Sequence, residues 1–248
     1  MKLDVLINKV KDEILFKTNP VSIFLYGSYN TTEYLPGVSD LEIGVFRKKK
    51  EDVPGEILRE IARRYSTKKI SLRIYGYDVS GLKRVKINSP FTKSVFIRHL
   101  ILTSKTIWGK KVMENLPLPS ISLIDVYREA CFSTMRALSG LFFLRAENLA
   151  EATEMAYKAC MFSTLSLEQM MGKFPVGFRN IVKLSKKLPL KPEERKLIKI
   201  AYGIRQRKTK LSKNQLSSFV FEVMTYCSQT VEERILEKLK RGNKISVR

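Results

Sequence analysis

The sequence predicts an α+β domain followed by an all-α helical bundle. Two observations lead to this fold class. Residues 1–118 contain both the two-residue alternation of strands and the three-to-four-residue spacing of amphipathic helices, whereas residues 119–248 keep the helical spacing and lose the strand pattern. Pro117 and Pro119 interrupt the chain between the two patterns. We therefore expect a domain boundary near 116–120, with a small mixed sheet before it that carries its helices on one face.

The first half reads, in order, as helix, strand, strand, helix and strand. A helical stripe runs from Leu3 to Ile14 and is stopped by Asn19-Pro20. Beyond it, β-branched and aromatic runs and strict alternation indicate strands, and Pro54 stands where the first turn of a helix tolerates proline. The expected elements are a helix over 2–17, strands over 21–26, 41–45 and 70–75, a helix over 54–65, a short helix over 95–102 and a brief strand over 105–108.

The second half reads as helices joined by loops. An apolar stripe with helical spacing indicates a long first helix and is made of Ile124, Tyr127, Cys131, Met135, Leu138 and Phe142. The next segment has a similar stripe, made of Ala156, Cys160, Ser163 and Leu167. A loop over 174–177 follows, Pro192 opens another helix, and Ser212 is the expected cap of the last one.

The charge of the chain is strongly basic but evenly spread. There are 46 Lys and Arg residues against 24 Asp and Glu, a formal net charge of +22. The first 118 residues hold 22 basic and 12 acidic residues, and the remainder holds 24 and 12. Phosphate binding needs positive charges that converge on one track, so the charge is compatible with RNA binding but does not locate a binding face.

Cysteine usage and hydropathy exclude several classes of protein. Cys131, Cys160 and Cys227 have no CxxC spacing and His99 is the one histidine, which excludes a disulfide framework and a Cys/His zinc site. No stretch of about eighteen apolar residues occurs, as a membrane span would need. We expect a cytoplasmic protein with no signal peptide and no membrane partner, and a homodimer is compatible with the sequence.

Two short motifs on successive strands carry the chemistry. The first strand ends in Gly27-Ser28, where a residue without Cβ lets backbone amides and a hydroxyl approach a phosphate. Asp40 and Glu42 are two residues apart on the second strand, so both carboxylates leave one face while Leu41 faces the core. Neighbouring like charges are best accommodated by a hard divalent cation such as Mg²⁺. Together the motifs predict a site for a metal ion and a triphosphate.

This pattern resembles the DNA polymerase beta-type nucleotidyltransferase superfamily. The resemblance lies in Gly-Ser after a strand, a loop over 29–38 with an internal glycine, and Ser-Asp-Leu-Glu on the next strand. It implies that Gly27 and Ser28 contact the phosphates of a nucleotide. It also implies that Asp40 and Glu42 bind the Mg²⁺ ions that activate an attacking hydroxyl and neutralise the leaving pyrophosphate.

The resemblance covers roughly residues 20–110. A second resemblance is architectural: a short strand that ends in Ile107-Trp108-Gly109 and is followed by a helical bundle looks like the aminoglycoside-type nucleotidyltransferases and their archaeal relatives. It implies that the first domain is the nucleotidyltransferase domain and that the bundle is its C-terminal companion.

The sequence departs from the family at the position of a third carboxylate. Many relatives carry an acid on the later strand, but the open face of that strand offers Ser71, Arg73 and Tyr75. Asp78 is the nearest acid, and it is in phase with the core residues, so it would need a bulge to turn toward the site. Aminoglycoside-type enzymes can take a base from the helical domain, where the candidates are Glu129, Glu151 and Glu154.

Arg73 is the cation that strand phase brings nearest to the predicted site. A triphosphate that approaches Asp40 and Glu42 meets two negative charges, and a nearby cation offsets their repulsion. We therefore expect Arg73 to bind nucleotide. The alternative is a surface arginine paired with Glu42 and without a role in binding.

The resulting hypothesis is Mg²⁺-dependent transfer of a nucleoside monophosphate from an NTP to a hydroxyl acceptor, with release of pyrophosphate. The acceptor is open among a small molecule, RNA and a protein side chain. The alternative is a protein that keeps the nucleotidyltransferase fold and binds a nucleotide or a partner with weak or no turnover, which the absent third acid favours.

Overall fold

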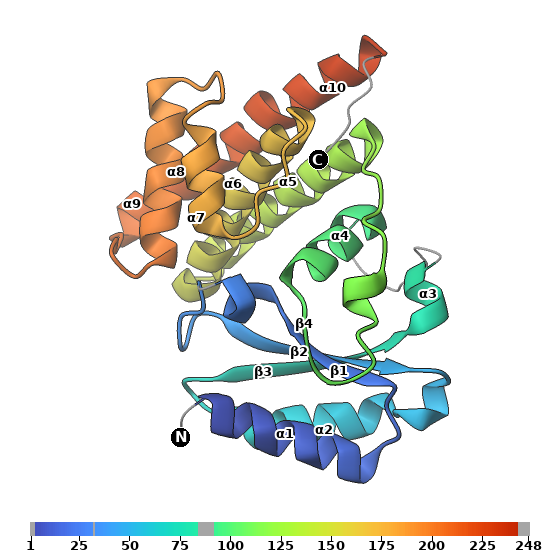
Figure 1. Cartoon of the computed structure of the whole chain (residues 1–248). Helices are drawn as coiled ribbons and strands as arrows, with labels where there is room; N and C mark the ends of the chain where they lie inside the picture. Colours follow the sequence, from blue (N-terminus) through green and yellow to red (C-terminus); the bar gives the residue numbers. More distant parts are fainter. Residues whose placement is uncertain (1–2, 32, 84–91, 243–248) are drawn as a thin grey trace. The chain divides into compact units, whose positions relative to one another are not determined.

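The computed structural model describes residues 3–31, 33–83 and 92–242 and contains an α+β part and a helical part (Figure 1). The chain divides into two compact units, Met1–Pro119 and Ser120–Arg248. The predicted fold class is confirmed, and the predicted boundary between 118 and 119 lies next to this division. Each unit is described below by itself.

The first unit is built on a four-stranded mixed sheet with the strand order β3-β2-β1-β4. β1 pairs antiparallel with both β2 and β4, and β2 pairs parallel with β3. The described elements are α1 (Leu3–Lys17), β1 (Ser22–Tyr26), the 3₁₀ turn η1 (Gly27–Thr31), β2 (Asp40–Arg47), η2 (Lys50–Asp52), α2 (Gly55–Tyr65), β3 (Ser71–Asp78), α3 (Val79–Lys83), α4 (Lys93–Thr103), β4 (Lys105–Gly109) and η3 (Met113–Asn115).

One face of the sheet is covered by α1 and α2, as Figure 1 shows. The apolar stripe of α1 predicted from the sequence is buried, with Leu6, Val10 and Ile14 inaccessible to solvent. These side chains pack against the residues of β1, β2 and β3 that alternate onto this face, namely Ile23, Leu25, Leu41, Ile43, Val45, Leu72 and Ile74. The main core of the unit therefore lies between these two helices and the sheet.

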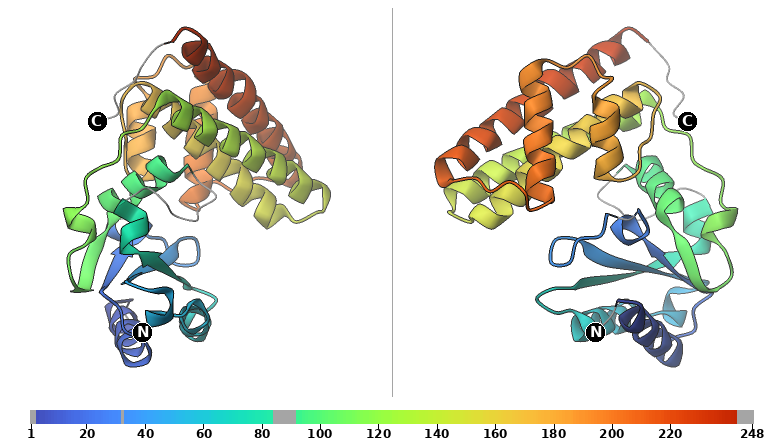
Figure 2. Two further views of the ribbon diagram at one scale, coloured as in Figure 1. Left: turned by 90° about the vertical axis from the view of Figure 1, so that its right-hand side faces the viewer. Right: turned by 60° about the vertical axis from the view of Figure 1, so that its left-hand side comes forward.

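The expectation that helices cover only one face of the sheet is wrong, because α4 packs on the opposite face (Figures 1 and 2). Phe24 and Phe46 alternate onto that face and stack at a ring distance of 4.8 Å. Such large apolar groups need cover, and Ile97 and Leu100 of α4 supply it. The second layer extends along only part of this face, since the start of β2 carries polar side chains.

The second unit is a bundle of helices. They are α5 (Leu123–Arg145), α6 (Leu149–Met170), α7 (Phe178–Ser185), α8 (Pro192–Arg205), α9 (Lys213–Thr225), the π-helical segment η4 (Tyr226–Glu232) and α10 (Glu233–Lys240). Capping boxes start two of them: Ser122 with Asp125 at α5, and Ser212 with Gln215 at α9, as predicted for Ser212. Small residues let α5 and α6 approach closely, and those buried between or beside them include Ala130, Ala137, Gly140, Ala152 and Ala156.

The sequence predicted the long helix α5 correctly, but most of the apolar stripe that indicated it is exposed. Of the apolar stripe, Met135 is 65% exposed and Phe142 is 58% exposed, and Ile124 and Leu138 are exposed as well. The buried face consists instead of small or short side chains, among them Val126, Ala130, Ser133, Ala137 and Gly140. The small size of these residues hides the face from a hydropathy pattern.

The side chain of Glu168 on α6 is buried in the helical unit, and its carboxyl forms no hydrogen bond among the residues that the structure describes. Burial raises the pKa of its carboxyl to about 9, because the charged form loses its hydration. At neutral pH this side chain is therefore held as the uncharged acid. No helix within the described ranges is long and apolar enough to cross a membrane.

The first prediction concerns the contact between β1 and β2 at Gly44. A Cβ at this position would lie 2.0 Å from the ring of Phe24, which is itself held by Phe46 and Tyr77. Gly44→Ala should lower the free energy of unfolding by about 1–3 kcal/mol through overpacking, measured by urea denaturation. Gly55→Ala is the control, because a Cβ there meets nothing closer than 3.4 Å; stability should stay equal or rise slightly. Equal stability of both variants would contradict the packing.

The second prediction concerns Glu168 and pH. The folded state keeps a proton on Glu168 up to a pKa of about 9, while the unfolded chain releases it near the ordinary carboxyl pKa of 4.5. The folded state thus loses stability as pH rises through this window. Relative to the wild type, Glu168→Gln should gain about 1.4 kcal/mol per pH unit between pH 5.5 and 8.5, measured as the difference between the two urea curves at each pH. A difference that does not change with pH would show that Glu168 is ionised in the folded protein.

Candidate functional site

The two acidic residues singled out in the sequence lie on one face of β2, as the strand phase predicts. Glu42 is in register with Tyr26 on β1 and with Arg73 on β3, and Asp40 opens the strand opposite Ser71. Both acidic side chains are half-buried, whereas Leu41 between them is fully buried on the opposite face. The pair therefore lies at one end of the β2–β3 ladder, on the face of the sheet that carries Phe24 and Phe46.

The turn after β1 brings the backbone directly against Glu42. Gly27 has φ of +76°, and a Cβ built on it would lie 2.2 Å from Oε2 of Glu42. Only glycine allows this conformation and this approach together. The sequence predicted Gly27 as a phosphate contact, but its N–H donates to Oγ1 of Thr103 at 3.1 Å. Its visible role is thus to make room for the carboxylate.

Thr103 and Asn30 fix this turn, and sequence reasoning missed both. The Thr103 hydroxyl is buried and donates to the carbonyl of His99 while it accepts from Gly27. The Asn30 amide donates to the carbonyls of Leu25 and Thr103, at 2.9 and 2.8 Å. Asparagine in a turn is a signal that could have been used. The threonine carries no such signal, because it is 76 positions away in the chain.

Ser28 and the loop that follows are held by hydrogen bonds of their own. The carbonyl of Ser28 accepts from the hydroxyl of Thr31 at 3.1 Å and from the N–H of Glu33 at 3.3 Å. Further along, the Ser39 hydroxyl accepts from the N–H of Leu35 at 2.9 Å, directly before Asp40. The half-buried Ser28 therefore stands in an ordered turn beside Gly27, where a hydroxyl can reach a ligand.

Arg73 forms an ion pair with Asp40 and not, as the sequence alternative supposed, with Glu42. Its Nε lies 3.0 Å from Oδ2 of Asp40, and the two side chains are 52% and 27% exposed. Burial lowers the pKa of Arg73, but a hydrogen bond with Tyr75 and the charges of Asp40 and Glu42 raise it, and the net shift is upward. The guanidinium is thus a permanent positive charge beside two acids.

Aromatic residues line the same region and stay uncharged. Burial raises the pKa of the Tyr26 hydroxyl, and the neighbouring Tyr77 and Glu42 raise it further. The hydroxyls of Tyr26 and Tyr77 lie 3.1 Å apart. Burial and the charge of Asp40 raise the pKa of Tyr34, whose hydroxyl is buried and finds no hydrogen-bond partner among the described residues. Tyr34 packs against the core beneath α1 and α2, on the other face of the sheet from the two carboxylates, so we assign it no part in the site.

Asp78, the candidate third acid of the first unit, does not join the pair on β2. Asp78 lies at the opposite end of the β2–β3 ladder, in register with Arg47, and forms an ion pair with it at 2.8 Å. Glu129 belongs to α5 in the second unit, with Glu151 and Glu154 on α6. Among the described residues, no three or more His, Cys, Asp or Glu side chains gather in a way that could hold a metal ion. Within the first unit, the site therefore offers two carboxylates and one arginine.

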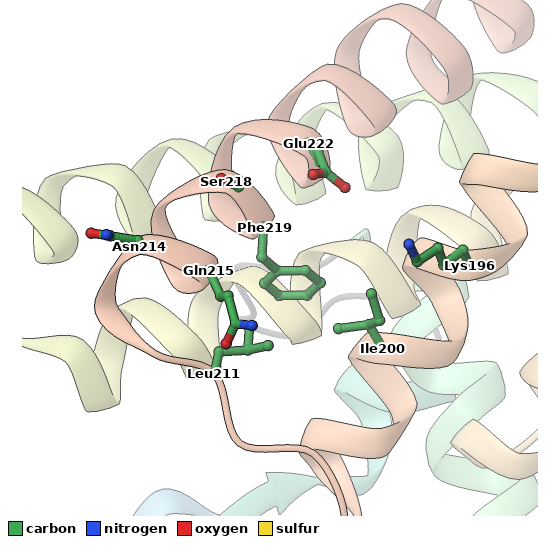
Figure 3. Close-up of a pocket in the computed structure, with 8 residues that line it drawn as sticks. All are labelled: Lys196, Ile200, Leu211, Asn214, Gln215, Ser218, Phe219 and Glu222. Atoms are coloured by element: carbon green, nitrogen blue, oxygen red, sulfur yellow. The ribbon is translucent and has the colours of Figure 1, made fainter.

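The second unit contains a hollow of its own. It has a volume of about 450 Å³ between α8 and α9, and Figure 3 shows the ring of Phe219 beside Ile200 with Lys196 and Glu222 nearby. One acid, one lysine and an apolar floor form no catalytic set, so we assign no reaction to it.

Comparisons with known proteins agree with this architecture. No protein-family profile and no curated protein match the sequence. Among solved structures, spectinomycin adenyltransferase AAD(9) from Enterococcus faecialis, crystallised with ATP and spectinomycin, is similar with a TM-score of 0.61 at 17% identity, over 90% of this chain and 98% of that one. A nucleotidyltransferase-like protein from Exiguobacterium sibiricum also matches, at 10% identity over 98% of this chain and 81% of that one, but its TM-score of 0.36 supports no argument. The chain therefore has a fold of the nucleotidyltransferase type.

Proposed function

We propose that the protein transfers a nucleoside monophosphate from an NTP to a hydroxyl acceptor, with Mg²⁺ bound and pyrophosphate released. The observation that carries this proposal is the pair Asp40 and Glu42 on one face of β2, with Gly27 brought against Glu42. The motifs and the fold agree on this reaction class, because the similar fold includes an adenyltransferase that was crystallised with ATP.

The donor set fits a metal ion that arrives with its nucleotide. Mg²⁺ prefers oxygen ligands and is usually bound by one or two carboxylates together with substrate phosphates, not by an all-protein cage. Asp40 and Glu42 supply two such carboxylates and would hold the ion. When bound, the metal supplies positive charge that neutralises the phosphates and lowers the pKa of an attacking hydroxyl.

The other residues of the site act on the nucleotide. Ser28 can donate its hydroxyl to a phosphate oxygen from the turn after β1, and Arg73 offers a permanent charge whose planar fork matches phosphate. Gly27 contributes by its lack of a side chain, since its N–H is occupied by Thr103.

ATP is the first nucleotide to test, given the ligand of the similar adenyltransferase. The acceptor stays open among three classes. The spectinomycin bound to that enzyme favours a small hydroxylated molecule, the net charge of +22 favours RNA, and a protein hydroxyl is the third candidate. Digestion of the labelled product with ribonuclease in one portion and protease in another separates them.

A second candidate function is nucleotide binding without turnover. Arg73 favours it, because an arginine occupies the strand position in register with Glu42 where a third acid would complete the site. Such a protein would bind ATP through the same residues but would label no acceptor.

The third prediction tests the reaction through the carboxylates. With ATP labelled at the α-phosphate, Mg²⁺ and cell extract, the wild type should produce a labelled acceptor. Asp40→Asn and Glu42→Gln should each reduce labelling on the order of 100-fold or more, because each removes a ligand that stabilises the transferring phosphoryl group. Asp78→Asn is the matched control: it removes the same charge from the same sheet at the Arg47 pair and should keep full activity.

The outcomes separate the two functions. Label in the wild type and in Asp78→Asn, but not in the two site variants, supports the transferase. Equal background in every protein, with ATP binding that is intact in the wild type and lost in Asp40→Asn, supports the binding protein. Labelling that survives both site substitutions would overturn the proposed site.

The fourth prediction isolates the role of Gly27. Gly27→Ala introduces a Cβ 2.2 Å from the Glu42 carboxylate at a positive φ, so it should displace Glu42 and abolish labelling. The control is Gly242→Ala, which has φ of +67° with open space around it. Both variants should lose about 1–2 kcal/mol of unfolding free energy from the left-handed backbone, measured by urea denaturation. Activity in Gly27→Ala equal to that in Gly242→Ala would show that the close approach to Glu42 has no functional role.

A further inference from the structure

We propose that Arg73 is an exchangeable counter-ion: it neutralises Asp40 in the free protein and transfers to the phosphates when a metal-bound nucleotide enters. This inference rests on the proposed function and extends it. The consequence is that the site binds a divalent metal weakly by itself and well only together with a nucleotide.

The contact that carries the inference is the ion pair between Nε of Arg73 and Oδ2 of Asp40, at 3.0 Å. Asp40 and Glu42 share one face of β2, and the guanidinium stands beside both on the neighbouring parallel strand. A cation already occupies the charge environment that a divalent metal would use. A metal that binds Asp40 must therefore compete with Arg73, because both are attracted to the same carboxylate.

The arginine is able to leave. Its side chain is 52% exposed, so release from Asp40 breaks no core packing. It forms a hydrogen bond with Tyr75 in addition to its ion pair with the acid. Ion pairs with this degree of exposure contribute only about 0.2–1 kcal/mol, which a ligand can readily offset.

The nucleotide gives the displaced guanidinium a new partner. A triphosphate carries several negative charges, and an arginine fork binds phosphate oxygens by parallel charge-assisted hydrogen bonds. With nucleotide present, Arg73 loses one anion and gains another, whereas with metal alone it loses Asp40 and gains nothing. Metal and nucleotide therefore increase each other's affinity, and this coupling is reciprocal.

The fifth prediction is that removal of Arg73 changes two affinities in opposite directions. With Mn²⁺ alone as the probe, Arg73→Ala should bind the ion about 1.5- to 5-fold more tightly than the wild type, measured from the signal of free Mn²⁺ by electron paramagnetic resonance. With Mg²⁺ and α,β-methylene-ATP, a nucleotide whose α–β link cannot be cleaved, the same variant should bind about 10- to 150-fold more weakly by calorimetry, which corresponds to 1.5–3 kcal/mol. The second effect should shrink as salt is added.

Two further variants make the test specific. Arg64→Ala removes the same charge from a side chain that is 51% exposed and also ion-paired, but on α2 at the other face of the sheet, so both affinities should stay within about two-fold of the wild type. Arg73→Gln keeps a long polar side chain without the charge and should follow Arg73→Ala. Agreement of the two Arg73 variants, with melting temperatures near that of the wild type, attributes the effect to the charge.

The outcomes distinguish this inference from the proposed function. If the wild type binds the metal-nucleotide and Asp40→Asn does not, the nucleotide site stands; Arg73 variants that then weaken both affinities, or change neither, overturn the exchange alone. If neither Mn²⁺ nor nucleotide binding depends on Asp40, the proposed function fails and the exchange fails with it. Tighter Mn²⁺ binding together with weaker nucleotide binding in both Arg73 variants supports the exchange.

Discussion

The two-residue period of β2 is the constraint on which the rest of the first unit depends. It sends Leu41, Ile43 and Val45 into the core beneath α1 and α2, and the same period sends Asp40 and Glu42 to the other face. A shift of one residue in its pairing would bury two charges and expose three aliphatic side chains. Burial of the aliphatic residues of β2 therefore also fixes the face on which Asp40 and Glu42 lie.

Local patterns in the sequence were sufficient for most of this arrangement. The phase of Asp40 and Glu42, the glycine turn and the order of helices and strands are all set by residues near one another in the chain. Arg73 was correctly brought to the acids, but its partner was wrong, because strand phase fixes a face and leaves the side-chain direction along the strand undetermined. Thr103 was out of reach, since its bond to Gly27 joins α4 to a turn 76 positions earlier.

The remaining differences between the predicted and the observed structure concern burial that a hydropathy pattern does not reveal. Phe24 was read as part of a strand, and Phe46 lies one residue beyond the strand expected over 41–45. The size of both side chains on the second face is what requires α4 as cover. On α5 the reverse holds: large apolar residues such as Phe142 are exposed, and Ala130 and Ala137 are buried because their small side chains let α6 come close. In a helical unit, the face that makes the closest contacts between helices can therefore be the one with the smallest side chains and the weakest hydropathy signal.

The bond between Gly27 and Thr103 links the covering helix to the chemistry. The Thr103 hydroxyl stands at the C-terminal end of α4 and receives the N–H of the residue that abuts Glu42. If α4 moved away from Phe24 and Phe46, the turn at Gly27 would lose this hydrogen bond, and the Glu42 carboxylate would be less well fixed in position. The exchange of the Gly27 amide proton with solvent deuterium therefore reports whether α4 is packed against Phe24 and Phe46.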